Sequence, residues 1–269
     1  MPELPEVEII TNSLKKQILG LKIIEVNVYC ENFKKKINKS FIKDLTNGKI
    51  LNIKRRAKYI LIELSNKKQI IFHLGMTGKI LIKEKGAYNK EKHDHIKILL
   101  SNDTYLIYND VRRFGLAKSC DIGQENFNLG IEPLSKEFNG AYLFDILKNK
   151  KKNIKSALLD QTIIAGLGNI YVCEVLFLSQ ISPFKQANEI SKDQCDKLSK
   201  EIKNILNKSI KMGGSSIKDY VQSDGTKGNF QNTFLVYAKQ GKPCKKCKNI
   251  IQRKMQSGRS TFYCSKCQK

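Results

Sequence analysis

The chain begins with MPELPEVE, residues 1–8, and runs on into a stretch whose apolar residues fall at helical spacing. Pro5 suits the first position of a helix, and acidic side chains in the first turn stabilise the helix dipole. Gly20 is a natural residue at which such a helix ends. The stretch therefore predicts a helix from Pro5 to Leu19 that packs one face on a core and holds the N-terminus in place. That face consists of Val7, Ile10, Leu14 and Ile18.

The same residues offer a nucleophile. The initiator methionine is normally removed before a small residue such as Pro2, which would leave a secondary amine beside the carboxylate of Glu3. A secondary amine that attacks a sugar aldehyde carbon gives an iminium ion, which is positively charged without first needing a proton. An amine nucleophile next to an acid/base is an arrangement for covalent catalysis. Taken alone, the stretch is also compatible with a plain helix start.

Size and charge narrow the class of protein. A chain of 269 residues can form two domains with proper cores. The 49 Lys and Arg residues exceed the 25 Asp and Glu residues, so that the formal net charge is +24. Such an excess favours a nucleic-acid partner. The alternatives are a ribosomal protein, a basic protein that binds non-specifically, or a drift of the composition towards lysine. Acidic residues stand where a signal peptide would be basic, and no apolar run approaches the ~20 residues of a membrane span, so we expect a soluble intracellular protein.

Seven short alternating runs separated by turn residues predict an antiparallel sandwich or barrel, which makes the N-terminal region an α+β domain. The runs cover residues 22–28, 49–54, 59–64, 69–74, 79–83, 96–100 and 104–108.

Three loops of this region stand out. Residues 54–59 place four cations between two strands. This loop either binds a phosphate or is a charged turn exposed to solvent. In residues 73–78, Met76 lies between glycines and either projects or is buried. Residues 110–115 combine two arginines with Phe114. An apolar wedge beside cations is how proteins kink a duplex and fill the gap left by an extruded base.

Beyond a linker at residues 121–135 the periodicity becomes helical. Asn139 can cap a helix that runs to Lys148, residues 154–159 predict a short helix, and Ser191 opens a long one that ends at Gly213. The glycine-rich turn at residues 166–171 precedes another helix, where it serves either as an anion site or for close helix packing.

The last residues carry the most specific spacing. Cys244-x2-Cys247 and Cys264-x2-Cys267 are separated by sixteen residues, which is a four-cysteine zinc pattern. Residues 242–269 contain nine Lys and Arg and no acidic residue, so this module should lie on phosphates. Cysteines outside the motif are expected as buried free thiols in a reducing compartment. They are Cys30, Cys120, Cys173 and Cys195.

Together these motifs resemble the formamidopyrimidine-DNA glycosylase family over essentially the whole chain. They are residues 2–7, 54–59, 73–78, 112–115, 166–171 and 222–225, with the four cysteines at the end. The resemblance implies a β-sandwich catalytic domain at residues 1–120, a helix–two-turns–helix domain at 136–230 and a zinc finger at 231–269, with DNA bound in the cleft between domains.

The resemblance also implies a function and a catalytic set. It implies a bifunctional glycosylase and AP lyase of base excision repair that removes oxidised purines and cleaves the strand by β,δ-elimination. Pro2 would attack C1′ of the damaged nucleotide, and Glu3 would protonate the sugar and open its ring. Glu6 would support the site. Lys58 would reach the lesion, and Arg259 would complete the catalytic set by holding a phosphate.

Further residues would contact DNA. The resemblance assigns a triad inserted into the duplex, phosphate-binding residues, and a polar loop at residues 222–230 that closes over oxidised guanine. The DNA-contacting residues are His93, Met76, Arg112, Phe114, Lys155 and Asn169. Val111 departs from the family, because a proline commonly precedes the arginine pair, and this puts the stiffness of the loop in doubt.

The implied cofactor is one structural Zn²⁺ bound by the four cysteines, and the implied partner is duplex DNA with oxidised bases. We expect a monomer in the bacterial cytoplasm, associated with the nucleoid through DNA. Two alternatives stay open: an endonuclease VIII-like glycosylase for oxidised pyrimidines, and a non-catalytic zinc-containing DNA-binding protein. Leu4 and the loops at residues 112–114 and 222–225 favour the oxidised-purine branch over the pyrimidine branch.

Overall fold

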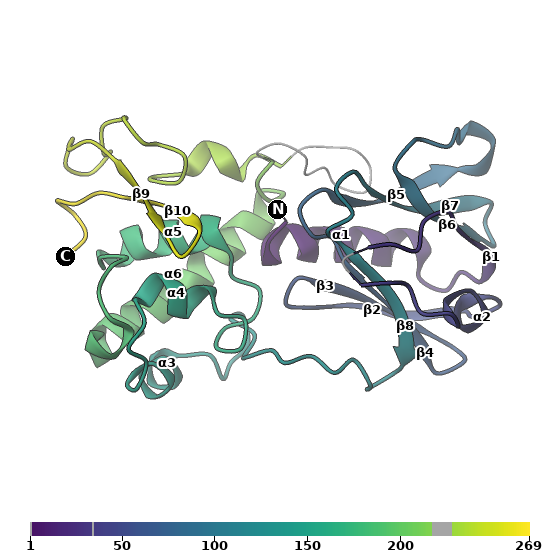
Figure 1. Ribbon diagram of the computed structural model, residues 1–269, viewed down its shortest axis with the longest axis horizontal. Coiled ribbons are helices and arrows are strands. Elements are labelled where there is room, and N and C mark those ends of the chain that lie inside the picture. The colour runs from purple at the N-terminus through teal and green to yellow at the C-terminus, as the bar shows by residue number, and fades with distance from the viewer. Residues whose placement is uncertain (1, 34, 217–227) are drawn as a thin grey trace. The chain divides into compact units, whose positions relative to one another are not determined.

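The computed structural model describes residues 2–33, 35–216 and 228–269, and the chain forms two compact units (Figure 1). The first unit comprises residues 1–127 and 213–229, and the second comprises residues 128–212 and 230–269. Strands dominate the first unit, and helices with one two-stranded sheet make up the second. The α+β architecture expected from the sequence is confirmed.

The first unit is a sandwich of two four-stranded antiparallel sheets. One sheet has the strand order β1-β6-β7-β5 and the other has the order β2-β3-β4-β8. The strands are β1 (Ile23–Val28), β2 (Ile50–Arg56), β3 (Tyr59–Leu64), β4 (Lys68–His73), β5 (Gly78–Glu84), β6 (Asp94–Leu100), β7 (Thr104–Asp110) and β8 (Leu116–Asp121).

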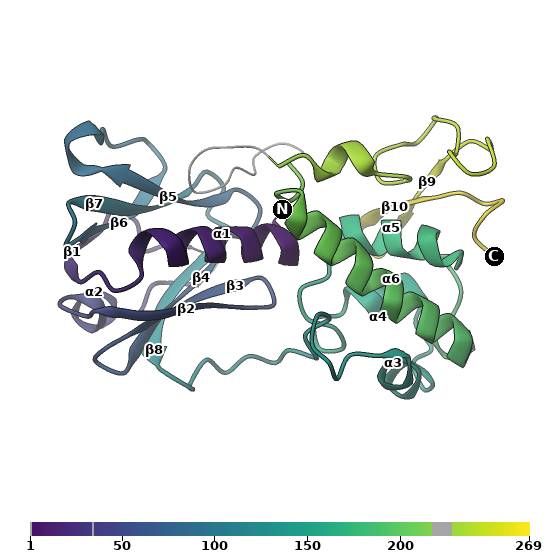
Figure 2. The same cartoon turned by 180° about the vertical axis from the view of Figure 1, so that it is seen from behind.

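Helix α1 (Leu4–Ile18) packs against β2 and β3, as Figure 2 shows from behind. The apolar face predicted for it is buried in the core between the sheets. Glu3 and Glu6 form a reciprocal capping box at its start, in which the Glu3 backbone N–H donates to Glu6 Oε2 at 2.9 Å. The core therefore fixes the position of the residues just after the N-terminus.

Two elements of this unit are not evident in the sequence pattern. Strand β8 turns Ala117 and Ser119 inward, and side chains this small give a weak hydrophobic alternation. Helix α2 (Phe41–Leu45) is too short for helical periodicity to appear. Between β5 and β6 lies the short 3-10 helix η1 (Lys85–Ala87).

In the second unit, α5 is buried on nearly all sides and packs against α4, α6 and β10 (Figures 1 and 2). Asn139 caps α3 through the Tyr142 N–H, and Ser191 opens α6 with a capping box, as the sequence predicts. The elements are α3 (Gly140–Leu147), α4 (Ile154–Leu159), α5 (Asn169–Ser179), η2 (Ala187–Glu189), α6 (Lys192–Lys211), η3 (Phe230–Thr233), β9 (Gln252–Gln256) and β10 (Arg259–Tyr263).

A buried carboxylate on α5 holds the segment that leads into the C-terminal sheet. Glu174 is 2% exposed, and it accepts the backbone N–H groups of Leu235, Val236 and Tyr237 at 2.8–2.9 Å. Burial raises the pKa of Glu174, and the three N–H groups act in the opposite direction. This contact ties the cysteine-bearing module to the helical core.

Two side chains, those of Asp160 and Gln161, form hydrogen bonds that hold the turn before α5. Gln161 accepts the Gly166 N–H at 2.9 Å and donates to the Leu167 carbonyl at 2.8 Å. Asp160 accepts the N–H and hydroxyl of Thr162 and binds the Lys152 ammonium at 2.5 Å. Burial alone would raise the pKa of Asp160, but the hydrogen bonds from Lys152 and Thr162 outweigh it and lower the pKa to about 2.

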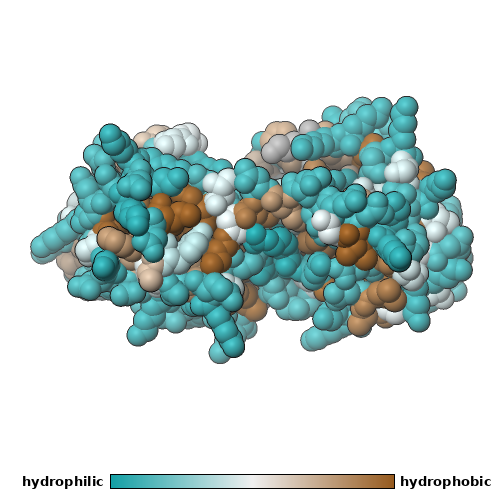
Figure 3. Space-filling model, turned by 90° about the horizontal axis from the view of Figure 1, so that it is seen from below, coloured by the Kyte–Doolittle hydropathy of each residue, from teal (hydrophilic) through white to brown (hydrophobic). Residues whose placement is uncertain are grey.

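The surface is polar and rich in lysine. On the face drawn in Figure 3, hydrophilic side chains cover most of the area and apolar side chains form small patches. In the described ranges there is no helix of the length and hydropathy that crossing a bilayer requires.

Cys173 and Cys195 are buried thiols, whereas Cys30 and Cys120 are half-exposed, so the expectation of burial is wrong for those two.

Replacing Asp160 with Asn should lower the free energy of unfolding at pH 7 by about 1 kcal/mol, a value reduced for solvent screening. Because the folded pKa is depressed, this contribution is present above about pH 4 and is lost as the pH falls towards about 2. Urea unfolding of both proteins between pH 2 and pH 7 would measure the difference. Asp145→Asn, at an exposed ion pair, is the matched control. If Asp160→Asn and the wild type were equally stable at pH 7, the ionised Asp160 carboxylate would not stabilise the folded state.

Candidate functional site

The residues proposed for the chemistry lie buried at the start of α1. Pro2, Glu3 and Glu6 are all buried, with Glu3 2% and Glu6 1% exposed. Glu6 Oε1 accepts both the N–H and the hydroxyl of Ser215 at 2.9 Å, while Oε2 accepts the Glu3 N–H. One carboxylate thus connects the residue next to Pro2 with the segment that follows α6. Gly214 lies so close that a Cβ there would be 3.2 Å from the Glu6 side chain.

Lys58 lies in the turn between β2 and β3, where Ala57 adopts a positive φ of 53°. Lys58 as a whole is 8% exposed. The neighbouring Arg55 donates to Glu8 on α1 at 2.5 Å and to the Ala57 carbonyl at 3.0 Å. This pair of bonds joins the Lys58 turn to the helix that begins at the N-terminus.

Met76, Arg112 and Phe114 come together on two adjacent loops. The Arg112 guanidinium donates to Met76 Sδ at 3.2 Å and lies over the Phe114 ring at 4.5 Å from its centroid. Met76 is 39% and Phe114 47% exposed, so both apolar side chains project into solvent. An exposed Met and Phe with a guanidinium between them form a compact wedge. The sequence leaves open whether Met76 projects or is buried, and in the structure it projects.

His93 is half-exposed and lies just before β6. Its carbonyl accepts the backbone N–H of Asp110, and its ring lies 6.3 Å from that of His95. His95 itself is buried, and its Nε2 lies 2.9 Å from the carbonyl of Asp110. His93 therefore stands beside the loop that carries Arg112.

In the second unit, Lys155 and Asn169 meet at one carbonyl. The Lys155 ammonium and the Asn169 amide both donate to the Ser260 carbonyl, at 3.1 and 2.9 Å. Lys155 is 1% exposed and also donates to Thr261 Oγ1 at 2.8 Å. Burial lowers its pKa, and the nearby Arg259 adds to this effect. These contacts position the strand that begins with the exposed Arg259.

Within the described residues, the Oδ1 atom of Asn169 is buried and has no hydrogen-bond partner. Asn169 is the first residue of α5, after the extended Gly168. The backbone N–H groups at such a helix start favour an anion. The glycine-rich turn of the sequence thus lies directly beside the β9–β10 hairpin.

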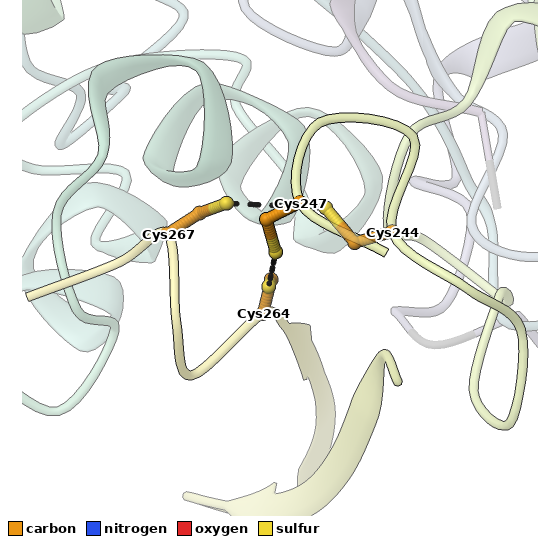
Figure 4. Close-up of side chains that lie close together, drawn as sticks. All are labelled: Cys244, Cys247, Cys264 and Cys267. Atoms are coloured by element: carbon orange, nitrogen blue, oxygen red, sulfur yellow. Dashed lines mark hydrogen bonds between the residues drawn. The ribbon is translucent and has the colours of Figure 1, made fainter. Parts of the chain in front are cut away.

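The four cysteines form one metal site (Figure 4). Their Sγ atoms lie within 4.8 Å of one another, with Cys247 and Cys264 3.4 Å apart and Cys244 and Cys267 3.9 Å apart. Tetrahedral Zn²⁺ with Zn–S bonds of about 2.3 Å requires sulfur separations of about 3.8 Å. The residues therefore fit one structural zinc ion, which would clamp the β9–β10 hairpin and its turn at Ser257 and Gly258.

Several residues that shape the site escaped sequence reasoning. Arg55 lay within a run of four cations, and Ser215 within a polar glycine-rich stretch. Neither has a sequence signal, since each acts on a partner far along the chain. Lys155, which is expected from the sequence to contact DNA, donates its ammonium to the Ser260 carbonyl and to Thr261 Oγ1 of the hairpin. Residues 222–225, expected in a loop over the lesion, lie outside the described residues.

Comparison with known families matches three models along the chain. Residues 1–117 match the formamidopyrimidine-DNA glycosylase N-terminal domain, and residues 129–221 match the formamidopyrimidine-DNA glycosylase H2TH domain. Residues 241–269 match the zinc finger found in FPG and IleRS. A formamidopyrimidine-DNA glycosylase of Wolbachia pipientis from Culex pipiens is 50% identical, and one from Rickettsia bellii is 41% identical; both alignments cover 100% of each chain.

Solved structures give the same match. A Lactococcus lactis FPG mutant in complex with a Fapy-dG containing DNA superposes with a TM-score of 0.92 at 38% identity, over 99% of both chains. MutM in complex with carbocyclic 8-oxo-G containing DNA superposes with a TM-score of 0.91 at 39% identity, again over 99% of both chains.

Removal of zinc should unfold the hairpin module, because its small core is built around the cysteines. We expect one zinc ion per chain by elemental analysis, and loss of that ion in Cys264→Ser. The half-exposed Cys120→Ser is the control and should keep the full zinc content. Full zinc content in Cys264→Ser would contradict the four-cysteine site.

Proposed function

The chain belongs to the formamidopyrimidine-DNA glycosylase family, and we infer from this that its substrate is an oxidised purine in duplex DNA. It is a DNA glycosylase of base excision repair, in a family with AP lyase activity. Structural relatives hold DNA with Fapy-dG, 8-oxo-G or an abasic site, which supports 8-oxoguanine and formamidopyrimidines as the lesions.

We propose that Pro2, after loss of Met1, is the nucleophile. Its nitrogen bonds to C1′ as the glycosidic bond breaks, and the damaged base leaves with the electron pair and takes up the proton that the nitrogen loses. Glu3 donates a proton to the ring oxygen, so that the sugar opens and an iminium ion remains. Loss of the C2′ proton then expels the 3′ phosphate by β-elimination, and loss of the C4′ proton expels the 5′ phosphate by δ-elimination.

The observation that carries this proposal is the position of Glu6. Its carboxylate accepts the Glu3 N–H and both donors of Ser215, which supports a fixed N-terminus with an acid one residue away. Lys58, in the turn joined to α1 through Arg55, is proposed to reach the lesion.

The remaining residues are proposed to bind the kinked duplex. Met76, Arg112 and Phe114 fill the gap left by the extruded base, with His93 beside them. Asn169, Lys155 and Arg259 form the phosphate-binding part of the second unit, where residues 230–269 contain no acidic residue. The polar loop that includes residues 222–225 would close over the lesion.

We retain as proposals the domain division 1–120, 121–135, 136–230 and 231–269, a monomeric state, and a cytoplasmic location with nucleoid association through DNA. An endonuclease VIII-like preference for oxidised pyrimidines is the second candidate. Parallel assays on 8-oxoguanine and on an oxidised pyrimidine separate the two.

An uncleaved extension in front of Pro2 should abolish base excision, because it converts the nucleophilic amine into an amide. Binding to a duplex with an abasic analogue should remain within a few-fold of the wild type. The control is the same extension with a protease site that restores Pro2 as the first residue, and activity should return on cleavage. Full excision by the extended protein would eliminate the proline mechanism.

Glu6→Gln should slow single-turnover excision by roughly tenfold to a hundredfold, since an amide N–H must now face either the Glu3 N–H or the Ser215 donors. The exposed Glu25→Gln is the matched control. A wild-type rate in Glu6→Gln would show that this carboxylate does not support the reaction.

A further inference from the structure

A second buried carboxylate lies beneath the wedge. Asp110 is the last residue of β7, and it is 0% exposed. On one side lies the Met76 loop, residues 74–78, and on the other the Arg112 loop, residues 111–115. Neither the proposed chemistry nor the proposed DNA contacts use this side chain.

The two oxygens of Asp110 hold both loops. Oδ1 accepts the hydroxyl of Thr77 at 2.5 Å and the backbone N–H of Arg112 at 3.3 Å. Oδ2 accepts the backbone N–H of Gly115 at 2.9 Å. The Thr77 hydroxyl oxygen in turn accepts the Arg112 N–H at 3.0 Å. One carboxylate thus bonds the Met76 loop through Thr77 and the Arg112 loop at both of its ends.

The loop backbones are also in close contact. A Cβ on Gly75 would lie 2.5 Å from the Phe114 carbonyl carbon. A Cβ on Gly115 would lie 1.8 Å from the Tyr108 hydroxyl and 3.0 Å from Asp110 Oδ2. The glycines therefore allow the two loops to approach, and the carboxylate holds them in that position.

The side chains of the wedge are less firmly held than the backbone of the two loops. Met76 and Phe114 project into solvent, and each contacts the Arg112 guanidinium that lies between them. Their direction therefore depends on the backbone of the loops. Val111 is 54% exposed and, unlike a proline, leaves its own φ unrestrained. The hydrogen bonds to Asp110 therefore restrain a loop whose backbone no proline ring fixes.

We propose that Asp110 is the positioning residue of the wedge. Its carboxylate locks the Met76 loop to the Arg112 loop, so that Met76, Arg112 and Phe114 enter the duplex as one rigid unit. This inference rests on the proposed function, because it concerns how the proposed DNA-inserting side chains are held.

Two substitutions break the lock from opposite sides. Asp110→Asn replaces one acceptor with an N–H2 group that must face either the Thr77 hydroxyl or the Gly115 N–H. Thr77→Val keeps the shape of the side chain but removes the hydroxyl that joins the loops. Thr77→Ser keeps the hydroxyl and serves as the rescue variant. Thr46→Val removes an exposed hydroxyl that donates to Ile42, and it is the matched control.

The probe is a duplex with 2-aminopurine opposite a tetrahydrofuran abasic analogue, titrated with full-length zinc-loaded protein. Insertion of the wedge unstacks the 2-aminopurine and raises its fluorescence, and no bond is made or broken. At saturation the rise should be at least about threefold smaller in Asp110→Asn and Thr77→Val, because loss of a hydrogen bond to a charged group shifts an equilibrium by about tenfold or more. Thr77→Ser and Thr46→Val should give the wild-type rise.

A wild-type rise in Asp110→Asn and Thr77→Val would overturn the inference. The same holds if the loss of signal is accompanied by a large fall in thermal stability, since the residue would then act only on folding. Excision of 8-oxoguanine by the wild type is measured in parallel. A wild type that inserts its wedge but excises nothing contradicts the proposed function and leaves the positioning role of Asp110 supported.

Discussion

The structure depends on buried carboxylates that bind backbone N–H groups. Removing a charged carboxylate from water is costly unless hydrogen bonds replace the lost hydration. Glu6, Asp110 and Glu174 all meet this condition, and each is nearly or fully buried. Each accepts donors from a segment that has no regular secondary structure of its own. A carboxylate paired in this way fixes a loop without covering it, so that the loop can still present side chains to a partner.

Each of the three carboxylates holds a different part of the molecule in place. Glu6 holds the residue next to Pro2, Asp110 holds the loops of the wedge, and Glu174 holds the chain that leads to the zinc module. In each case the carboxylate belongs to a regular element or its end, and the segment that it binds either belongs to the site proposed to act on DNA or leads into the zinc module. The rigid parts of the fold thereby determine the geometry of its irregular parts.

Much of the fold could be predicted from the sequence because its periodic signals are local. Strands β1 to β7 lie within two residues of the seven predicted runs, and helix α4 has the predicted bounds. Strand β8 was missed because Ala117 and Ser119 bury little apolar surface. The cysteine spacing was sufficient to predict the zinc site, and motif order was sufficient to indicate the family. Contacts such as those of Asp110 could not be predicted, since an aspartate before a turn has the same local pattern whether it is solvated or buried.

The proposal that the amine of Pro2 performs the chemistry can be tested by borohydride trapping on a duplex with one 8-oxoguanine opposite cytosine, followed by mass spectrometry of the cross-linked peptide. We predict a single adduct on a peptide that begins at Pro2, with Met1 absent. An adduct on a lysine such as Lys58, or no adduct on either oxidised-purine or oxidised-pyrimidine duplexes that the protein binds tightly, would contradict the claim.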